Sequence, residues 1–227
     1  MPRKSLVGLA MFVLVQGAAL ASGGSPMPGP RTSAPSPRLT PEQQATQSYN
    51  SGLKHQEKGD DLAKEADAQA ADPKKREKIE SQARKEYEKA MKEFKAATEK
   101  DPKMFQAHSG LGYTLRKTGD YDAALAAYNQ ALELEPHYSP AIEYRAEAYL
   151  GLNRVDDAKS AYVTLFSGDR KRADELQAAM KRWLEKRRQD PQGVAPEAIE
   201  EFSKWMAQRE EIAGRTSALT QPKDDRW

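Results

Sequence analysis

Residues 104–138 read MFQAHSGLGYTLRKTGDYDAALAAYNQALELEPHY, and the pattern of small and large apolar residues in this stretch recurs before and after it with a period of 34. Three sets of residues keep that period: Ala90, Ala124 and Ala158; Phe94, Tyr128 and Tyr162; Ala97, Ala131 and Leu165. A repeat of this length predicts one helix-turn-helix unit per period. Because no unit buries its apolar face alone, we expect the units to stack in series into an all-α solenoid.

The middle unit, residues 105–138, divides into two helices. The pattern predicts a first helix over residues 105–117, a turn at Gly119-Asp120 and a second helix over residues 121–134, ended by Pro136. Helical spacing places six residues on the facing sides of this pair: Leu111, Leu115, Ala124, Tyr128, Ala131 and Leu132. Gly112 and Ala124 are predicted to lie where the two backbones approach most closely.

Several residues of the middle unit carry a family resemblance: Leu111-Gly112, Gly119-Asp120-Tyr121, Ala124, Tyr128, Ala131 and Pro136 resemble the signature of the tetratricopeptide repeat. The next unit, residues 139–168, is similar to it but less strict. Arg145 stands where the family normally has an apolar residue, and Asn153 replaces the turn glycine. These departures indicate a unit near the end of the stack.

The first unit, residues 42–104, is interrupted. Gly52 and Gly59-Asp60 fit the end of its first helix, and Tyr87 and Phe94 fit its second helix, so residues 61–86 are an insertion at the turn. The insertion is rich in Ala, Lys and Glu and breaks only at Asp72-Pro73. This composition favours helix, so we expect both helices to extend into a long antiparallel hairpin. The residues expected to face each other across it are Leu62, Ala66 and Ala70 with Ile79 and Ala83.

After residue 168 the repeat pattern fades, and residues 169–215 are predicted to form two closing helices. Two apolar stripes support this: Leu176, Ala179, Met180, Trp183 and Leu184, then Ile199, Phe202, Trp205, Met206 and Ile212. Terminal units of solenoids are commonly atypical because they seal an open end. The alternative interpretation is that Trp183 or Trp205 is an exposed anchor for a partner. Residues 216–227 are polar and are expected to form a flexible tail.

The first residues resemble a secretory signal. Arg3 and Lys4 precede an apolar run over residues 6–15, and Ala19-Leu20-Ala21 offers a cleavage site, so residues 1–21 are predicted to be a signal peptide. An uncleaved anchor is the alternative, but Gln16 and Gly17 interrupt the run below the length that spans a bilayer. Residues 22–41, dense in Pro, Ser and Gly, are expected to be a disordered linker. Thr40 then offers a helix cap with Gln43.

Charge and cysteine content narrow the function classes. Removing the two cations of the leader would leave 34 basic residues against the 34 acidic ones of the chain, which disfavours a nucleic-acid binder. The chain has no cysteine, so it has neither disulfides nor a thiol for lipidation. The sequence therefore predicts a periplasmic or secreted protein that is not stably inserted in a membrane. Its oligomeric state stays open.

No catalytic, cofactor or metal constellation stands out. The three histidines, His55, His108 and His137, lack the spacing of metal or catalytic sites, and no Gly-rich phosphate loop is present. Two runs of cations, Arg170-Lys171-Arg172 and residues 181–188, are interpreted as solvated surface. The alternative is an electrostatic footprint for an anionic envelope component or an acidic partner, to which Arg187 and Arg188 would contribute.

The resemblance implies a function. In tetratricopeptide repeats, the first helix of each unit lines a concave groove that receives a peptide. The groove positions of this chain lack the Lys-Asn pairing with which chaperone-binding members clamp a terminal carboxylate. The corresponding positions here are Tyr49, Leu53, Gln56, Gln106, Ser109, Tyr113, Arg116, Lys117, Glu143, Glu147 and Leu150. We therefore expect a non-enzymatic exported adaptor that binds an envelope or secreted protein. A self-associating structural protein, and less so an accessory hydrolase or polysaccharide-binding protein, are the alternatives.

Overall fold

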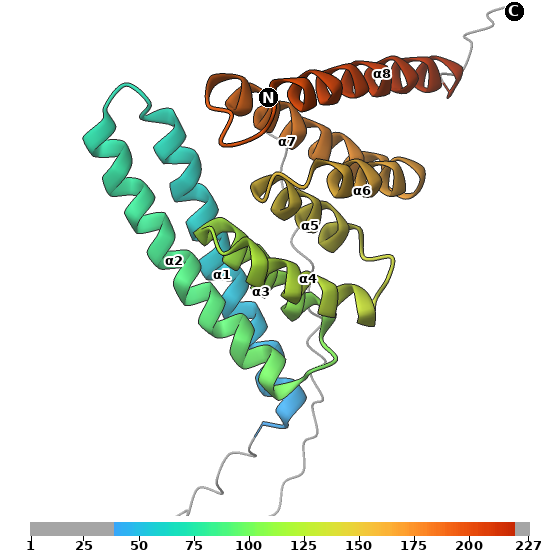
Figure 1. Ribbon diagram of the computed structural model, residues 1–227. Helices are drawn as coiled ribbons and strands as arrows, with labels where there is room; N and C mark the ends of the chain where they lie inside the picture. Colours follow the sequence, from blue (N-terminus) through green and yellow to red (C-terminus); the bar gives the residue numbers. More distant parts are fainter. Residues whose placement is uncertain (1–38, 221–227) are drawn as a thin grey trace, which may run out of the picture. The chain divides into compact units, whose positions relative to one another are not determined.

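The computed structural model describes residues 39–220. Within this range the chain forms helices joined by short turns, without a strand (Figure 1). The helices are α1 (Pro41–Ala68), α2 (Pro73–Lys100), α3 (Phe105–Thr118), α4 (Tyr121–Leu134), α5 (Ser139–Gly151), α6 (Val155–Gly168), α7 (Arg170–Gln189) and α8 (Pro196–Thr220). The predicted signal peptide, most of the predicted linker and the last residues of the predicted tail lie outside the described residues. None of the described helices combines the length and the apolarity needed to cross a membrane.

The helices pack in series, as the repeat predicts. Each helix contacts the next one along the chain from α1 to α8, while α3 also contacts α1 and α5, and α5 also contacts α7. The first helices of successive units therefore lie against one another, and the second helices join each unit to its neighbour. This is the all-α solenoid that the period implies. The observed bounds of α4 are those predicted, and α3 extends one residue further than predicted, to Thr118.

The turns show why particular residues recur at the ends of the first helices. Gly119 ends α3 with φ of 93°, a left-handed conformation that glycine adopts without steric penalty. The Asp120 side chain then accepts a hydrogen bond from the Ala123 amide and caps α4. Asn153 takes the glycine position in the next unit with φ of 59°. Asparagine is one of the few other residues that tolerate this conformation, which explains the substitution.

Glycines within the helices allow aromatic rings to pack where two helices approach each other most closely. A Cβ on Gly112 would lie 2.7 Å from the Tyr128 ring, so the predicted need for a small residue there is confirmed. A Cβ on Gly52 or Gly110 would meet the ring of Phe94 at the same distance. Phe94 and Tyr128 are fully buried, so neither ring has space to withdraw. The recurring aromatic side chains therefore pack between neighbouring helices, and each lies directly against the backbone of a glycine, where a larger residue would not fit. We call such a glycine a seat for the ring.

Gly112→Ala is expected to lower the free energy of unfolding by about 1–2 kcal/mol, because overpacking outweighs the gain in helix propensity. Gly214→Ala is the matched control: Gly214 lies in α8, and a Cβ there would meet nothing within 4 Å. The control should be neutral or stabilising by up to about 1 kcal/mol. Urea unfolding followed by circular dichroism measures both variants. Equal stabilisation of both would contradict the seat assigned to Gly112.

The insertion forms the predicted hairpin, and α1 and α2 run through it without interruption. Gly59-Asp60, which corresponds to the turn dipeptide Gly119-Asp120, lies inside α1 instead. Of the residues expected to face each other, Ala66, Ile79 and Ala83 are buried and Leu62 is half-buried. Ala70 is exposed, contrary to prediction, because α1 ends at Ala68 and Ala70 lies in the turn. The predicted capping box of Thr40 and Gln43 begins α1.

A carboxylate holds the base of the hairpin. Glu86 on α2 lies 2.7 Å from His55 Nδ1 and accepts hydrogen bonds from Lys58 Nζ at 3.0 Å and Lys89 Nζ at 2.9 Å. Its side chain is only 7% exposed. The hydrogen bonds from Lys89 and His55, against the opposing effect of burial, lower the pKa of Glu86 to about 2. Because the folded-state pKa is depressed, this stabilisation is present above the ordinary carboxyl pKa and is lost as pH falls toward 2.

Glu86→Gln is expected to lower stability at neutral pH by about 1–2 kcal/mol, since its hydrogen-bonding partners are partly exposed and screened. The difference between wild type and variant should shrink by roughly half or more at about pH 3, where the unfolded carboxyl is largely protonated. Denaturant unfolding at the two pH values tests this. A difference that stays constant with pH would show that the carboxylate charge contributes nothing.

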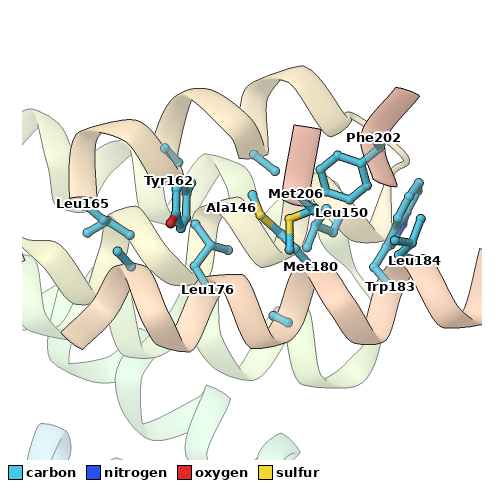
Figure 2. Close-up of a cluster of buried hydrophobic side chains, with 14 of the residues drawn as sticks. Ala146, Leu150, Tyr162, Leu165, Leu176, Met180, Trp183, Leu184, Phe202 and Met206 are labelled. Atoms are coloured by element: carbon cyan, nitrogen blue, oxygen red, sulfur yellow. The ribbon is translucent and has the colours of Figure 1, made fainter. Parts of the chain in front are cut away.

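The closing helices share one core with the last full unit. Figure 2 shows Trp183, Met180 and Leu176 of α7 beside Tyr162 of α6 and Phe202 of α8. Trp183 is 6% exposed and meets Phe202 edge-on at 5.4 Å, and Trp205 packs against the same core. The core interpretation is thus confirmed, and Trp183 is not an exposed anchor.

Two details at the chain's end differ from prediction. Ile212 is 40% exposed, although it belongs to the predicted apolar stripe. The helix also continues beyond residue 215 to Thr220, within the predicted tail. No glycine or proline interrupts the sequence between Gly214 and Pro222, so the helix can propagate.

Candidate functional site

Asp60 joins the hairpin to the second unit. Its Oδ1 accepts hydrogen bonds from the Tyr87 hydroxyl at 2.7 Å and the Tyr113 hydroxyl at 2.6 Å, and Lys117 Nζ lies 3.8 Å away. Burial, followed by the Asp60 carboxylate, raises the pKa of both tyrosines, so both hydroxyls remain donors. Because α1 continues through Gly59-Asp60, this aspartate is free of the capping role that Asp120 performs. It fixes α1, α2 and α3 to one another.

Arg116 continues the polar contacts from α3 to α5. Its Nη1 lies 2.5 Å from Glu147 Oε2, and its guanidinium lies 5.0 Å from the Tyr113 ring centroid and 5.4 Å from that of Tyr144. The two rings meet edge-on with centroids 5.0 Å apart. Burial is the largest effect and opposes the charge of Arg116, but the Glu147 carboxylate together with Tyr128 and Tyr113 outweighs it, so the arginine pKa is raised. The arginine therefore bridges two units as a permanent cation.

Arg172 makes the next link, from α7 to α5. Its Nη1 donates to Glu143 Oε2 at 2.6 Å, to Glu175 Oε2 at 3.0 Å and to the Tyr144 hydroxyl at 3.2 Å. The Glu143 side chain is 4% exposed. Burial raises the pKa of Glu143 to about 7 although the hydrogen bond from Arg172 opposes that effect. The closing helix is thus anchored through a buried carboxylate.

The structure brings together the predicted groove positions of α3 and α5, but mostly to hold helices to each other. Ser109, Glu143 and Leu150 are buried, and Leu150 borders the open cavity described below, so the groove assignment of these three stays a prediction. Tyr113, Arg116 and Glu147 are engaged as described above. Tyr49 packs on Phe94, Gln56 and Gln106 are half-buried, and Leu53 is 38% exposed. The sequence register places a residue on the inner face but does not show what the next unit brings against it.

The polar contacts of Asp60, Arg116 and Arg172 form a ladder that joins successive helices. An open cleft lies beside this ladder, between the hairpin and the last turns of α3 and α7. One part has a volume of about 520 Å³ and is lined by residues of both hairpin helices, including Ala63 and Arg84, and by Lys117, Tyr121 and Lys186. A second part of about 290 Å³ is lined by residues of α5 and α7, including Trp183 and Arg182. Both parts are bordered by Arg116, Tyr121 and Lys186, so they adjoin. We call the two together the hairpin cleft.

The hairpin cleft carries more positive than negative side chains. Its cations are Arg84, Arg116, Lys117, Arg182, Lys186 and Arg187, and its acids are Asp67, Glu80 and Glu147. Glu147 is paired with Arg116, and Glu80 with Arg76 at 2.7 Å. Within the described residues, the side chains of Arg182 and Lys186 form no hydrogen bond or ion pair. The charge left uncompensated is therefore mainly positive.

The basic stretch does not act as a single surface. Arg187, interpreted as solvated surface with an anionic footprint as the alternative, is 8% exposed, and its Nε donates to Asn153 Oδ1 at 2.9 Å. That interpretation is wrong for Arg187, because the residue locks the end of α7 onto the turn after α5. Arg188 donates to the Ser203 hydroxyl at 2.7 Å. The sequence reasoning missed Arg84 and Ala63, whose only signal was their place in the insertion.

The described residues contain no group of three or more His, Cys, Asp or Glu side chains placed to hold a metal ion. His55 is engaged with Glu86, and His108 Nε2 lies 2.9 Å from the Pro102 carbonyl oxygen.

Comparison with known proteins agrees with the fold. Residues 105–138 match the family profile of the tetratricopeptide repeat, so the chain contains this repeat. A solved structure similar to this chain is the Sgt2 TPR domain from Aspergillus fumigatus, at 20% identity over 75% of this chain and 89% of that one, with a TM-score of 0.35. No curated protein matches the chain. The chain therefore contains a tetratricopeptide repeat within a solenoid of serially packed helices.

Proposed function

We propose that this chain is a non-enzymatic adaptor that binds a segment of another protein in the hairpin cleft. The observation that carries the proposal is the convergence of both hairpin helices with α3, α4 and α7 on one open cavity of about 520 Å³. The inner face of the repeats is largely occupied by its own ladder of ion pairs, and the cleft is the adjoining surface with unengaged side chains. Apolar and charged groups alternate there, as in protein recognition sites.

Site-specific photo-crosslinking in the host cell tests this proposal. A photoreactive phenylalanine derivative replaces Lys186 in the cleft or, as control, the exposed Gln130 on α4. We expect protein adducts from position 186 and not from position 130. Ala63→Trp, which fills the cleft from the hairpin side, should remove those adducts without changing the melting temperature by more than about 3 °C. Adducts that form equally at both positions, or that survive Ala63→Trp, would contradict the proposal.

The same adaptor is proposed to act outside the cytoplasm, with an envelope or secreted protein as partner. The support is the N-terminal sequence: Arg3 and Lys4, an apolar run over residues 6–15, and small residues before Ser22. Cell fractionation with mass spectrometry of the mature N-terminus tests this. We expect the exported protein to begin at Ser22, and an intact Met1 on a cytoplasmic protein would contradict it.

A further inference from the structure

Two cations on one face of α7 are left without partners. Arg182 and Lys186 are four residues apart, which places them one above the other on the helix. Both line the hairpin cleft, and neither side chain forms a hydrogen bond or ion pair with any residue that the structure describes. The neighbouring cations differ: Arg116 is paired with Glu147 and Arg187 is bound to Asn153.

The opposite wall of the cleft also presents positive charge. Arg84 on α2 donates from Nη2 to the Thr118 carbonyl oxygen at 3.1 Å, and its nearest carboxylate, Glu88, is 3.9 Å away and exposed. Lys117 on α3 also lines the cleft, and its Nζ lies 3.8 Å from Asp60 Oδ1. A negatively charged segment entering the cleft would therefore meet cations on both sides, from the hairpin and from α7.

The cleft also borders a buried donor that the fold does not satisfy. Trp183 Nε1 is buried and has no hydrogen-bond partner within the described structure. Trp183 lines the part of the cleft that Arg182 and Lys186 also line. Buried donors are nearly always paired in folded proteins, so an unpaired one beside a cavity suits an acceptor supplied by a ligand.

Resting on the function proposed above, we propose that the hairpin cleft takes an acidic polypeptide segment in which carboxylates alternate with apolar residues. Beside the cations, the lining of the cleft includes Ala63, Tyr121 and Trp183, which suits a segment with side chains of both kinds. Asp67 and Glu80 also border the cleft and would repel the dense, regular charge of a nucleic-acid backbone or an anionic membrane. Arg182 and Lys186 are the residues that select for the carboxylates.

The cations of the last turn of α7 also complement its helix dipole, which would explain Lys186 without a ligand. The two roles differ in what they affect. A dipole role changes stability alone, whereas a recognition role changes binding at constant stability. Arg182 lies more than one turn from the end of α7, where the dipole effect is weak.

The probe is a fluorescein-labelled peptide in which glutamates alternate with leucine or phenylalanine, measured by fluorescence anisotropy against the full chain. Arg182→Glu with Lys186→Glu should weaken binding by about tenfold or more. The control, Lys171→Glu with Lys204→Glu, makes the same charge change at exposed positions outside the cleft and should stay within about twofold. Raising salt from about 50 to 300 mM should weaken wild-type binding, and the glutamine version of the peptide should bind at least about tenfold more weakly.

An affinity indifferent to the double charge reversal, or equal affinity for the glutamine peptide, would overturn the proposal. So would stronger displacement of the peptide by single-stranded RNA or by phosphatidylglycerol vesicles than by unlabelled peptide. The photo-crosslinks distinguish a failure of this proposal from a failure of the proposed function. If Ala63→Trp removes them and Arg182→Glu, made in the chain that carries the photoreactive residue at position 186, leaves them, the cleft binds a protein segment but does not select it by its negative charge. If neither change affects them, the proposed function falls as well.

Discussion

Replacing Phe94 with Ala is expected to lower the free energy of unfolding by about 3–5 kcal/mol, the range for deleting a fully buried aromatic ring. Phe94 is 0% exposed, and its ring fills the seats left by Gly52 on α1 and Gly110 on α3. It also meets Tyr49 with centroids 5.7 Å apart. One side chain of α2 thus joins three helices, and the glycines opposite it carry no side chain that could move into the cavity.

Urea unfolding followed by circular dichroism measures this effect. Phe105→Ala is the control, because Phe105 is an aromatic residue of the same size that is only half-buried, against Tyr138 at 4.9 Å. The control should lose clearly less stability than Phe94→Ala. A loss below about 1 kcal/mol for Phe94→Ala would mean that the first unit is not wedged onto the second in this way.

Arg172→Met should destabilise the protein by about 3–5 kcal/mol above neutral pH, because it leaves the buried carboxylate of Glu143 without its cation. Glu143 can relieve that penalty only by taking up a proton. Burial already raises its pKa to about 7 in the presence of Arg172, and the substitution raises it further. Since the folded-state pKa lies above the unfolded value, stability is retained at low pH and lost as pH rises through the folded pKa.

The variant should therefore be markedly less stable at about pH 9 than at about pH 5, relative to wild type. Combining it with Glu143→Gln removes the charge and should recover much of the loss at high pH. Lys171→Met, on an 83% exposed side chain of the same helix, should change stability by less than about 0.5 kcal/mol. Denaturant midpoints across the pH range test all three, and a pH-independent loss for Arg172→Met would contradict the assignment.

The fold could be predicted in detail where small and aromatic residues keep a strict period. Gly112, Ala124 and Tyr128 predicted both the helices and their closest approach, because a ring packed on a backbone leaves few residue types to choose from. The hairpin was predictable for the opposite reason. An Ala-, Lys- and Glu-rich stretch with one proline break has no plausible alternative to two helices.

The binding surface could not be predicted in the same way, because it depends on which partner each polar side chain finds. Asp60 and Asp120 occupy the same place in the repeat, yet one joins three helices and the other caps a helix. The repeat register places Leu150 on the inner face, and Arg187 belongs to a run of cations, yet both are buried: Leu150 lies in a core shared with α7, and Arg187 is bound to Asn153. Such outcomes follow from tertiary contacts that no local pattern encodes.

A cleft of fixed width requires Asp60 to hold the hairpin against α3. The chain has no cysteine, so spin labels can be placed at Lys64 on the hairpin and Glu185 on α7 through introduced cysteines alone. Pulsed electron–electron double resonance should give one narrow distribution of distances between the two labels. Asp60→Ala should broaden this distribution, because it leaves the hydroxyls of Tyr87 and Tyr113 without an acceptor. A broad distribution in the otherwise unaltered chain, or one that Asp60→Ala leaves unchanged, would contradict a preformed partner-binding cleft.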